Sequence, residues 1–496
     1  MISAIVFVPL FVAILYVFIP GENKKFFKIG SLSTTILVFL ASLWLFVKFN
    51  PANPLPQFVE LKKWIGFGLN YRVGADGISL MLLILTTFLM PLAVASSWNY
   101  IKEREKEYYI MLLLLETGML GVFVAQNLFL FYIFWEAMLI PMYFLIGIWG
   151  GEKRVYATVK FVLYTMLGSL LMLVGIFYLW KISPEHSLYF YDLYSLEISP
   201  SVQILLFAAF GLAFAIKVPL FPFHTWLPDA HTEAPTAGSV LLAGVLLKMG
   251  GYGFLRLAMP IFPEGFRAFF PYLIVLAVIS IIYGAAMAFV QKDAKRLVAY
   301  SSVSHLGVVM LGIFILTLKA YTGGIYQMLN HGLSTGALFL LVGMIYERTH
   351  TREMEKLGGL ARPLPVLAGF LIITVLSSIG LPGLNGFIGE FLVFIGTFEA
   401  SKTVAAFAAL GVILSAVYLL WMYQRVMQGK VKNADYMKLP DMNLREILIM
   451  VPIVILYLWM GLYPKFFISK FEKSAKFMLE ITNKPQIARV IQGGGK

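Results

Sequence analysis

The chain has 496 residues, of which 60% are hydrophobic and only 13% are charged, and its mean hydropathy is +0.83. These values exclude a soluble globular protein and indicate an integral membrane protein. The chain has no cysteine, which excludes disulfides and thiolate-bound iron–sulfur clusters, and its formal net charge of +13 makes the distribution of basic residues informative.

Apolar runs follow one another along nearly the whole chain. Each run can cross about 30 Å of hydrocarbon as an α-helix, whereas a membrane β-barrel would show short segments of alternating polarity. The pattern predicts an all-α integral membrane protein with about fourteen spans. The expected spans are residues 2–20, 29–47, 78–97, 108–125, 128–148, 157–180, 202–221, 236–257, 271–290, 297–316, 322–346, 365–396, 403–425 and 446–464. The first run lacks the flanks of a signal peptide, so we expect a retained helix.

Lys and Arg are concentrated in the odd-numbered loops between the expected spans. Because basic loops stay on the cytoplasmic side of a membrane, this bias predicts that both termini lie on the outer, periplasmic side of the cell inner membrane. The lysine-rich tail after Pro464 runs against this orientation, but a tail carries less weight than short loops between helices.

Two of the expected spans contain helix-breaking residues. The seventh is interrupted at KVPLFPFH by Pro219 and Pro222, and the twelfth at SSIGLPGLNGFIGEF by Pro382 and four glycines. Broken spans at corresponding places indicate an internal repeat of the transporter type. Because each copy would contain an odd number of spans, the two copies would have opposite orientations in the membrane. The alternative is two coincidental proline kinks. The expected divisions are N-terminal transmembrane helices in 1–107, a first repeat in 108–257, a second, inverted repeat in 271–427, and a last transmembrane helix with a basic tail in 428–496.

Ionisable residues inside the expected spans are candidates for a proton or ion path, because a charge in hydrocarbon costs at least a few kcal/mol. They are Glu136, Lys217, Lys248, His305, His331 and Glu390. A carboxylate and an ammonium buried together stabilise each other's charge, so a change in the distance from Glu136 to Lys217 would switch proton release from the lysine. The proton could then pass to Lys248 and through the two histidines to Glu390. A hydrated opening at the helix break would explain why Lys217 is tolerated.

Each candidate also has a purely structural interpretation. Glu136 could belong to a buried salt bridge, the lysines could extend to the membrane interface, and the histidines could be hydrogen-bonded core residues. We interpret Glu116, in IMLLLLETGMLGVF, as a helix-packing polar group. The run HTWLPDAHTEAPT carries residue types found in metal sites, but its prolines predict a loop, so we favour capping over metal binding. The residues concerned are His224, Asp229, His231 and Glu233.

Five stretches together resemble the antiporter-like membrane subunits of respiratory complex I, and the resemblance covers nearly the whole chain. They are FWEAMLIPMYFLIGIWGG, AFAIKVPLFPFHTWLPDAHTEAPTAGSVLLAGVLLKMGGYGFLR, AYSSVSHLG, YQMLNHGLSTGALFLLVGMIYERTHTR and GLPGLNGFIGEFLVF. The resemblance implies a fold of about fourteen helices with two inverted five-helix repeats. Within the family, a glutamate at position 390 is typical of M-type subunits, equivalent to mitochondrial subunit four, whereas L-type and N-type subunits and Mrp-type antiporters carry a lysine there.

The resemblance also implies roles for individual residues. The family pattern makes Glu136 and Lys217 the coupling pair, Lys248 the central relay, Glu390 the exit-side group, His331 a relay histidine, and His305 a motif residue with a weaker claim to a proton role. No charged position departs from this pattern.

The function implied by the resemblance is that of a proton-translocating membrane-arm subunit of NADH-quinone oxidoreductase, a translocase. The chain itself would bind no cofactor: NADH, FMN, iron–sulfur clusters and quinone would belong to partner subunits. The L-type and N-type subunits would be its neighbours in the lipid bilayer, and no nucleic acid is involved. The alternatives are a subunit of a related ferredoxin- or hydrogenase-linked complex, an Mrp-type cation/proton antiporter subunit, and a scaffold whose buried charges are only structural.

Overall fold

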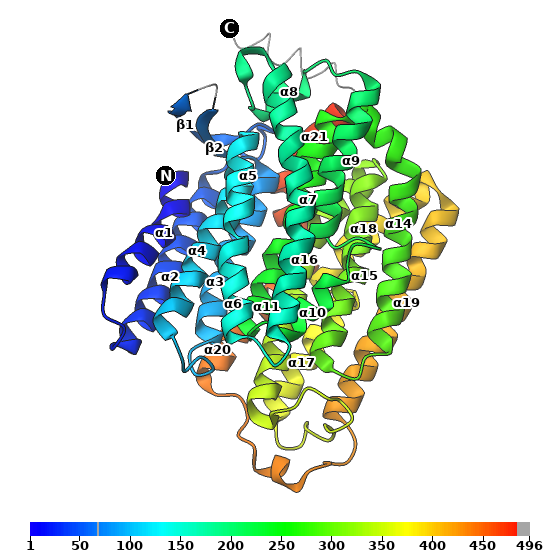
Figure 1. Cartoon of the computed structure of the whole chain (residues 1–496). Helices are drawn as coiled ribbons and strands as arrows, with labels where there is room; N and C mark the ends of the chain where they lie inside the picture. The colour runs from blue at the N-terminus through cyan, green and yellow to red at the C-terminus, as the bar shows by residue number, and fades with distance from the viewer. Residues whose placement is uncertain (67–68, 484–496) are drawn as a thin grey trace.

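The computed structural model describes residues 1–66 and 69–483, and its long helices stand side by side in one bundle (Figure 1). The N-terminal residue and the last described helix lie toward the same end of this bundle, the upper end in Figure 1. We call it the upper end and its opposite the lower end.

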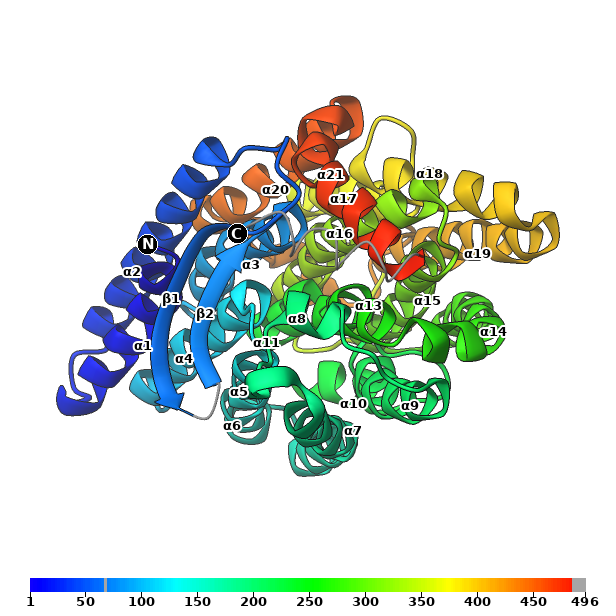
Figure 2. The ribbon, with the colours of Figure 1, turned by 90° about the horizontal axis from the view of Figure 1, so that it is seen from above.

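The N-terminal part contains three helices and a β-hairpin. The elements are α1 (Ile2–Phe18), α2 (Lys24–Lys48), β1 (Gln57–Gly66), β2 (Leu69–Ala75) and α3 (Gly77–Ser96). The two strands are antiparallel and lie across the upper end of the bundle (Figure 2). The sequence predicted no strand, because a charged segment of this length between two apolar runs looks like an ordinary loop.

The next part contains the first broken span. Its elements are α4 (Glu105–Val124), α5 (Leu128–Ala137), α6 (Leu139–Trp149), α7 (Arg154–Ile182), the short 3₁₀ turn η1 (Pro184–His186), α8 (Phe190–Tyr194), α9 (Pro200–Lys217), α10 (Trp226–Glu233), α11 (Thr236–Leu241), the π-helical turn η2 (Leu242–Leu246), α12 (Leu247–Gly253), the π-helical turn η3 (Phe254–Ala258) and α13 (Met259–Ile261). The expected break falls between α9 and α10.

The last part contains the second broken span. Its elements are α14 (Pro263–Phe289), α15 (Ala294–Phe314), α16 (Leu318–Thr349), α17 (Pro365–Ser378), α18 (Asn385–Ala400), α19 (Lys402–Met427), the 3₁₀ turn η4 (Ala434–Lys438), α20 (Leu444–Leu462) and α21 (Pro464–Asn483). The expected break separates α17 from α18.

The predicted membrane fold is confirmed. Within the described residues, 12 helices are long and apolar enough to cross a membrane, and α1 and α17 are shorter apolar helices. Each of these elements overlaps an expected span. The count of about fourteen spans and the inverted relation of two repeats stay predictions.

The innermost helices are α11 to α13, α15 and α16 (Figure 2). In the most apolar stretches of residues 236–261 and of α15 every residue is buried, whereas only 33% are buried in the corresponding stretches of α2 and α19. The peripheral helices therefore present apolar side chains to the outside of the bundle. Lys248, His305 and His331 lie on the innermost helices, where the interface is out of reach, so the snorkelling interpretation of Lys248 is wrong.

The basic tail expected after Pro464 is in fact an amphipathic helix, α21. Its residues Phe467, Phe471 and Met478 are buried against the upper end of the bundle, whereas Lys465 and Lys473 are exposed. Apolar residues at helical spacing on one face and lysines on the other are typical of a helix that lies on a surface.

A buried ion pair connects the upper ends of three of these helices. Arg256 in η3 bonds the carboxylate of Asp76, and both side chains are at most 1% exposed. Asp76 also caps α3, because its Oδ1 accepts the N–H of Ser79 at 2.9 Å. Arg256 Nη1 lies 3.3 Å from the sulfur of Met478 on α21. The pair therefore fixes α3, η3 and α21 relative to one another.

We expect Asp76→Asn to destabilise the chain by about 3–5 kcal/mol, because asparagine can still cap α3 but leaves the Arg256 charge buried without a counter-charge. The unfolding temperature and the assembled amount of the chain in membranes measure this. The matched control is Asp293→Asn, which alters another helix-capping aspartate paired with an arginine, Arg352, but at a site where both side chains are about a quarter exposed. An equal loss in both variants would contradict a special role of the buried pair.

Candidate functional site

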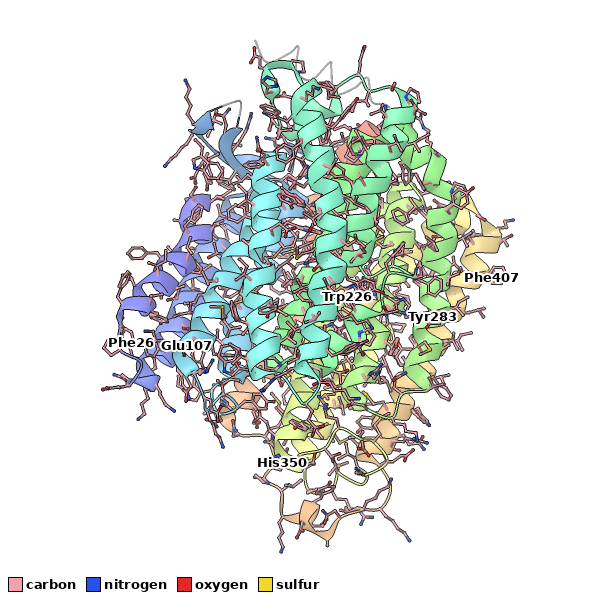
Figure 3. The ribbon with its side chains drawn as sticks, viewed as in Figure 1. Phe26, Glu107, Trp226, Tyr283, His350 and Phe407 are labelled. Carbon is pink, nitrogen blue, oxygen red and sulfur yellow. The ribbon has the colours of Figure 1, made fainter. Side chains whose placement is uncertain are left out.

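Lys217 is the last residue of α9, directly before the break. Pro219 cannot donate a backbone hydrogen bond, so carbonyl groups near the end of α9 need other donors. The Ala215 carbonyl accepts the N–H of Leu220 at 2.7 Å, and the Ile216 carbonyl accepts the indole N–H of Trp226 at 2.9 Å. Trp226 lies near mid-height of the bundle, far above His350 at its lower end (Figure 3). Protein donors thus satisfy these two carbonyls, where the sequence suggested hydration.

The Lys217 side chain is enclosed by protein. The residue is 1% exposed, and its ammonium lies 5.2 Å from the ring centre of Trp135 and 5.8 Å from that of Phe161. Such aromatic faces attract a cation. The ammonium has no hydrogen-bond partner among the described residues.

Glu136 lies on α5 within electrostatic range of Lys217 and within hydrogen-bonding range of Ser169. One of its carboxylate oxygens is buried without a partner in the described part of the chain. The two residues therefore face each other without a direct ion pair, so the structural salt bridge considered for Glu136 is not formed in this conformation.

The helix that carries Glu136 is interrupted just after it. α5 ends at Ala137 and α6 begins at Leu139, and Met138 between them keeps helical backbone dihedrals, so the two segments continue as one 22-residue helix with a local irregularity. Pro141 has no N–H to donate to the Ala137 carbonyl, which explains the interruption. The sequence did not predict this joint, although Pro141 is the signal for it.

Lys248 lies on α12, between the two π-helical turns, and is fully buried. Its ammonium donates to the carbonyl of Ala243, which belongs to η2, and lies 2.6 Å from Nδ1 of His331 on α16. A π-helical turn changes the backbone hydrogen-bond register and is common at functional sites. Here it offers the lysine a carbonyl five residues earlier in the chain.

A line of polar side chains continues from His331. Its ring centre lies 6.0 Å from that of His305 on α15. His305 Nδ1 lies 3.3 Å from Oε1 of Glu390 on α18, and its Nε2 lies 3.3 Å from the hydroxyl of Tyr418 on α19. Lys248, His331, His305 and Glu390 thus form one buried series across four helices.

Three further polar residues belong to this series, and the sequence did not single them out. Gln327 donates to Glu390 Oε1 at 3.2 Å, Asn330 donates to the Gln327 amide oxygen at 2.9 Å, and Tyr418 contacts His305. Gln327 lies four residues before His331 and three before Asn330, so helical spacing relates Gln327 to each of them and could have identified it.

The structure brings the six candidates together as two groups. Glu136 and Lys217 form one group, and Lys248 through Glu390 form the other. No hydrogen bond between described side chains joins Lys217 to Lys248. The helices that carry them are nevertheless in close contact, because a Cβ on Gly250 would lie 2.7 Å from the Phe214 carbonyl oxygen.

The polar run after the break makes structural contacts. Asp229 pairs with Lys160 at 2.8 Å and with Arg296 at 3.4 Å. His231 stacks on Phe339 with ring centres 4.6 Å apart, and Glu233 accepts the backbone N–H of Lys153 at 2.9 Å. In residues 1–66 and 69–483 no group of three or more His, Cys, Asp or Glu residues is arranged to hold a metal ion.

Glu116 on α4 is fully buried. Neither of its carboxylate oxygens has a hydrogen-bond partner within the described ranges, so the inter-helix hydrogen bond expected for a packing residue is not formed. It stands apart from the series that ends at Glu390.

Comparison with known proteins assigns the chain to a family. Residues 1–122 match the family model described as NADH-ubiquinone oxidoreductase chain 4, amino terminus, and residues 125–416 match NADH:quinone oxidoreductase/Mrp antiporter, TM. NADH-quinone oxidoreductase subunit M of Rhodobacter capsulatus is 47% identical over 94% of this chain and 93% of its own length. The chain belongs to the subunit M family of NADH-quinone oxidoreductase. The subunit M of Rickettsia prowazekii is 44% identical over 96% of this chain and 98% of its own length.

Solved structures agree with membership of the subunit M family. A chain of respiratory complex I from Thermus thermophilus superposes with a TM-score of 0.89 at 34% identity, covering 97% of this chain and all of that one. A chain of the Mrp complex from Dietzia sp. DQ12-45-1b has a TM-score of 0.86 at 20% identity, covering 98% and 99%. This second likeness shows the shared fold alone.

We expect Gly389→Ala to slow turnover of this subunit M family member at least about threefold, because the added Cβ would overlap the Gln327 amide oxygen and displace that side chain from Glu390. NADH oxidation per assembled complex measures the effect. The control is Gly369→Ala on α17, where a Cβ meets nothing within 4 Å and the rate should not change. A normal rate in Gly389→Ala would show that the Gln327 contact is dispensable.

Proposed function

We propose that the chain carries protons through the buried series Lys248, His331, His305 and Glu390, under the control of the Glu136–Lys217 pair. The observation that carries this proposal is the row of buried titratable side chains formed by two polar contacts, Lys248–His331 at 2.6 Å and His305–Glu390 at 3.3 Å, whose two imidazole rings have centres 6.0 Å apart. Buried titratable groups in contact are suited to proton transfer, and inside a membrane they mark proton paths.

The Glu136–Lys217 pair acts as the switch in this proposal. When the carboxylate approaches, the ammonium is stabilised and the lysine keeps its proton; when it recedes, the proton is released toward Lys248. The joint after Glu136 and the break after Lys217 give both residues backbone that can move. The proton would cross from Lys217 to Lys248 through water or a side-chain movement, since no described hydrogen bond joins them.

The redox chemistry belongs to the assembly. NADH, FMN, iron–sulfur clusters and quinone are assigned to partner subunits, and this chain converts a conformational change into proton movement. Its neighbours are the L-type and N-type antiporter-like subunits, one on either side in the membrane. The apolar outer faces of helices such as α2 and α19 suit contact with a neighbouring subunit or with the bilayer.

Two alternative functions are less well supported: a subunit of a related ferredoxin- or hydrogenase-linked complex, and a subunit of an Mrp-type cation/proton antiporter. Curated relatives at 44–47% identity are subunits of NADH-quinone oxidoreductase, whereas the Mrp chain shares 20% identity with this one and an archaeal sulfane sulfur reductase chain shares 24%. Glu390 also differs from the lysine that the Mrp-type family carries. An antiporter subunit would exchange cations without any electron donor.

We place the lower end of the bundle in the cytoplasm and both termini on the periplasmic side of the inner membrane. The connections between α6 and α7, between α14 and α15 and between α16 and α17 lie at the lower end (Figure 1), and basic residues in or beside these connections include Lys153, Arg296, Arg348 and Arg352. Basic loops remain on the cytoplasmic side during insertion, which supports this orientation.

Glu136→Gln should lower NADH oxidation and proton uptake together, by at least about tenfold, because the amide cannot stabilise the Lys217 ammonium as a carboxylate does. Both rates are measured in inverted membrane vesicles at matched complex abundance. The matched control is Glu116→Gln, which changes a fully buried carboxylate on α4 that has no hydrogen-bond partner among the described residues.

The control should keep both rates within about twofold of wild type. Normal rates in Glu136→Gln would show that this carboxylate is structural. Equal losses in the two variants would show that the loss of any carboxylate in these helices slows the complex, and the switch would lose its support.

A further inference from the structure

Helix α10 connects the break after Lys217 to the lower end of the bundle. Its first residue, Trp226, donates its indole N–H to the carbonyl of Ile216, the residue directly before Lys217. Trp226 lies near mid-height, whereas His350 marks the lower end (Figure 3). The eight residues of α10 span about 12 Å at the rise of an α-helix. A movement of the end of α9 therefore acts directly on one end of α10.

The other end of α10 is held by two cations. Lys295 donates to the carbonyl of Ala234, the residue that ends α10, and Arg352 donates to the carbonyl of Thr232 at 2.5 Å. Carbonyls in the last turn of a helix have no partner within the helix, and the helix dipole favours cations there. Lys295 is only 8% exposed, so its contact lies inside the protein. We call Lys295 and Arg352 the α10 clamp.

Both residues of the α10 clamp are fixed to the start of α15. Lys295 is the second residue of that helix. Arg352 Nε lies 3.2 Å from Oδ2 of Asp293, which caps α15 with its other carboxylate oxygen. The backbone adds a second connection, because the N–H of Ala294 donates to the Arg352 carbonyl at 2.9 Å. The clamp therefore joins the end of α10 to the start of α15.

The helices held by α10 carry the two histidines of the buried series. His305 follows Lys295 on α15 at a distance of about 15 Å along the helix axis. His231 of α10 stacks on Phe339 of α16, with ring centres 4.6 Å apart, and α16 also carries His331. One short helix thus contacts the end of α9 on one side and both histidine-bearing helices on the other.

We infer that Lys295 and Arg352 are positioning residues, through which α10 transmits the state of the Glu136–Lys217 pair to His305 and His331. The inference rests on the proposed function, since it supplies a link between two groups that no described hydrogen bond joins. Closely packed protein interiors have low compressibility and transmit strain. A buried helix that is fixed at both ends is suited to this role.

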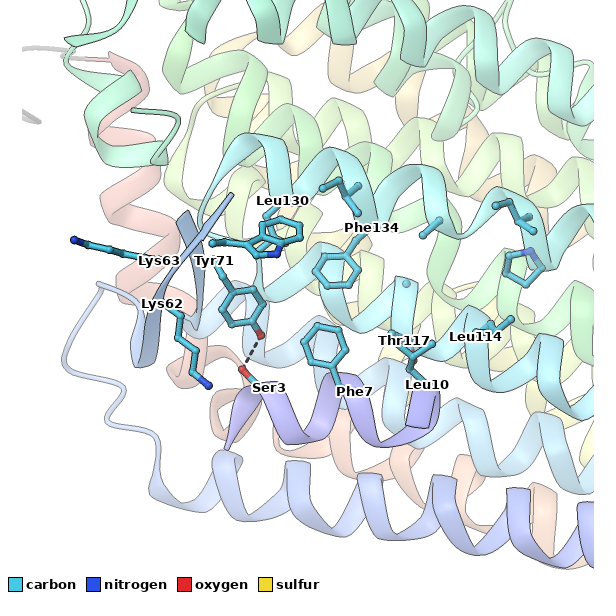
Figure 4. Close-up of a pocket in the computed structure, with 16 residues that line it drawn as sticks. Ser3, Phe7, Leu10, Lys62, Lys63, Tyr71, Leu114, Thr117, Leu130 and Phe134 are labelled. Atoms are coloured by element: carbon cyan, nitrogen blue, oxygen red, sulfur yellow. Dashed lines mark hydrogen bonds between the residues drawn. The ribbon is translucent and has the colours of Figure 1, made fainter. Parts of the chain in front are cut away.

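The helix that carries Glu136 is held less closely by the chain. An apolar groove of about 680 Å³ lies between α5, α6, α1 and α4, and Phe134, Ala137 and Pro141 line it (Figure 4). In α10, by contrast, Trp226 and His231 are completely buried. This difference fits a pair whose carboxylate helix moves and whose connecting helix is rigid.

The α10 clamp keeps proton movement in step with redox turnover. Without the clamp, the Glu136–Lys217 pair still changes its arrangement, but α15 no longer follows. A proton released by Lys217 then meets relay groups that are not aligned and returns to the side from which it came. NADH oxidation continues in part while fewer protons cross the membrane.

The test is the number of protons taken up per NADH oxidised by the whole complex in inverted membrane vesicles, at matched complex abundance. Wild type is compared with Arg352→Met and with Arg352→Met plus Lys295→Met, because methionine is unbranched but cannot donate to a carbonyl. We expect proton uptake to fall more than NADH oxidation in both variants, so that fewer protons are taken up per NADH. The double variant should lose more than the single one.

The matched control is Lys292→Met plus Lys356→Met, which removes two cations from the same two connections between helices. These side chains are 78% and 62% exposed and pair with glutamates that are themselves exposed. The control should keep the wild-type number of protons per NADH. Arg352 is about a quarter exposed, so the single variant still tests the inference if the double variant does not assemble.

Two results would overturn the inference. A wild-type number of protons per NADH in the Arg352 variants, at any rate of oxidation, would leave the clamp a structural role. An equal loss in the control would assign the effect to positive charge at this end of the bundle. Glu136→Gln in the same vesicles tests the proposed function separately. If it lowers both rates while the clamp variants keep the wild-type number, only the clamp is refuted.

Discussion

The functional site depends on how the protein stabilises the ammonium of Lys248. This residue is fully buried on the innermost helices, where an isolated charge would be prohibitively costly. Its partners are the Ala243 carbonyl and Nδ1 of His331. The His331 ring lies 6.0 Å, centre to centre, from that of His305, and His305 Nδ1 lies 3.3 Å from Glu390 Oε1. The polar partners of Lys248 and Glu390 thus place two imidazoles between these residues, and no hydrogen bond between described atoms joins the two rings.

Irregular backbone segments lie beside three of the buried charged residues, and one of them supplies a backbone carbonyl that a regular helix would not. The π-helical turn η2 presents a carbonyl to Lys248, and the break after α9 and the joint after α5 lie beside Lys217 and Glu136. Non-helical backbone at membrane depth is tolerated only where protein or a hydrated cavity satisfies it. Around Lys217 the protein does so, through the indole of Trp226 and the amide of Leu220. Protein donors therefore satisfy the backbone carbonyls at the break beside Lys217.

The length of an apolar run and the presence of proline are local properties, so the membrane class, the extent of the spans and the two breaks could be predicted from the sequence. The partnership of Lys248 with His331 could not be, because it depends on how α12 and α16 pack. The hairpin β1–β2 and the helix α21 were missed for a different reason: their apolar residues alternate with charges, and so they resemble polar loops beside long apolar runs. The family resemblance supplied the roles of the six candidates, but the support of Gln327 for Glu390 emerged only from the packed structure.

The most direct test of the proposed path is the replacement of its central group. Lys248→Met keeps an unbranched side chain of similar length but removes the proton carrier. Proton uptake and NADH oxidation would be recorded together in proteoliposomes that contain equal amounts of assembled complex. The account predicts that both rates fall together, because transfer between the Lys217 group and the Glu390 group is interrupted. Both rates at wild-type values would contradict it and assign the buried series a structural role.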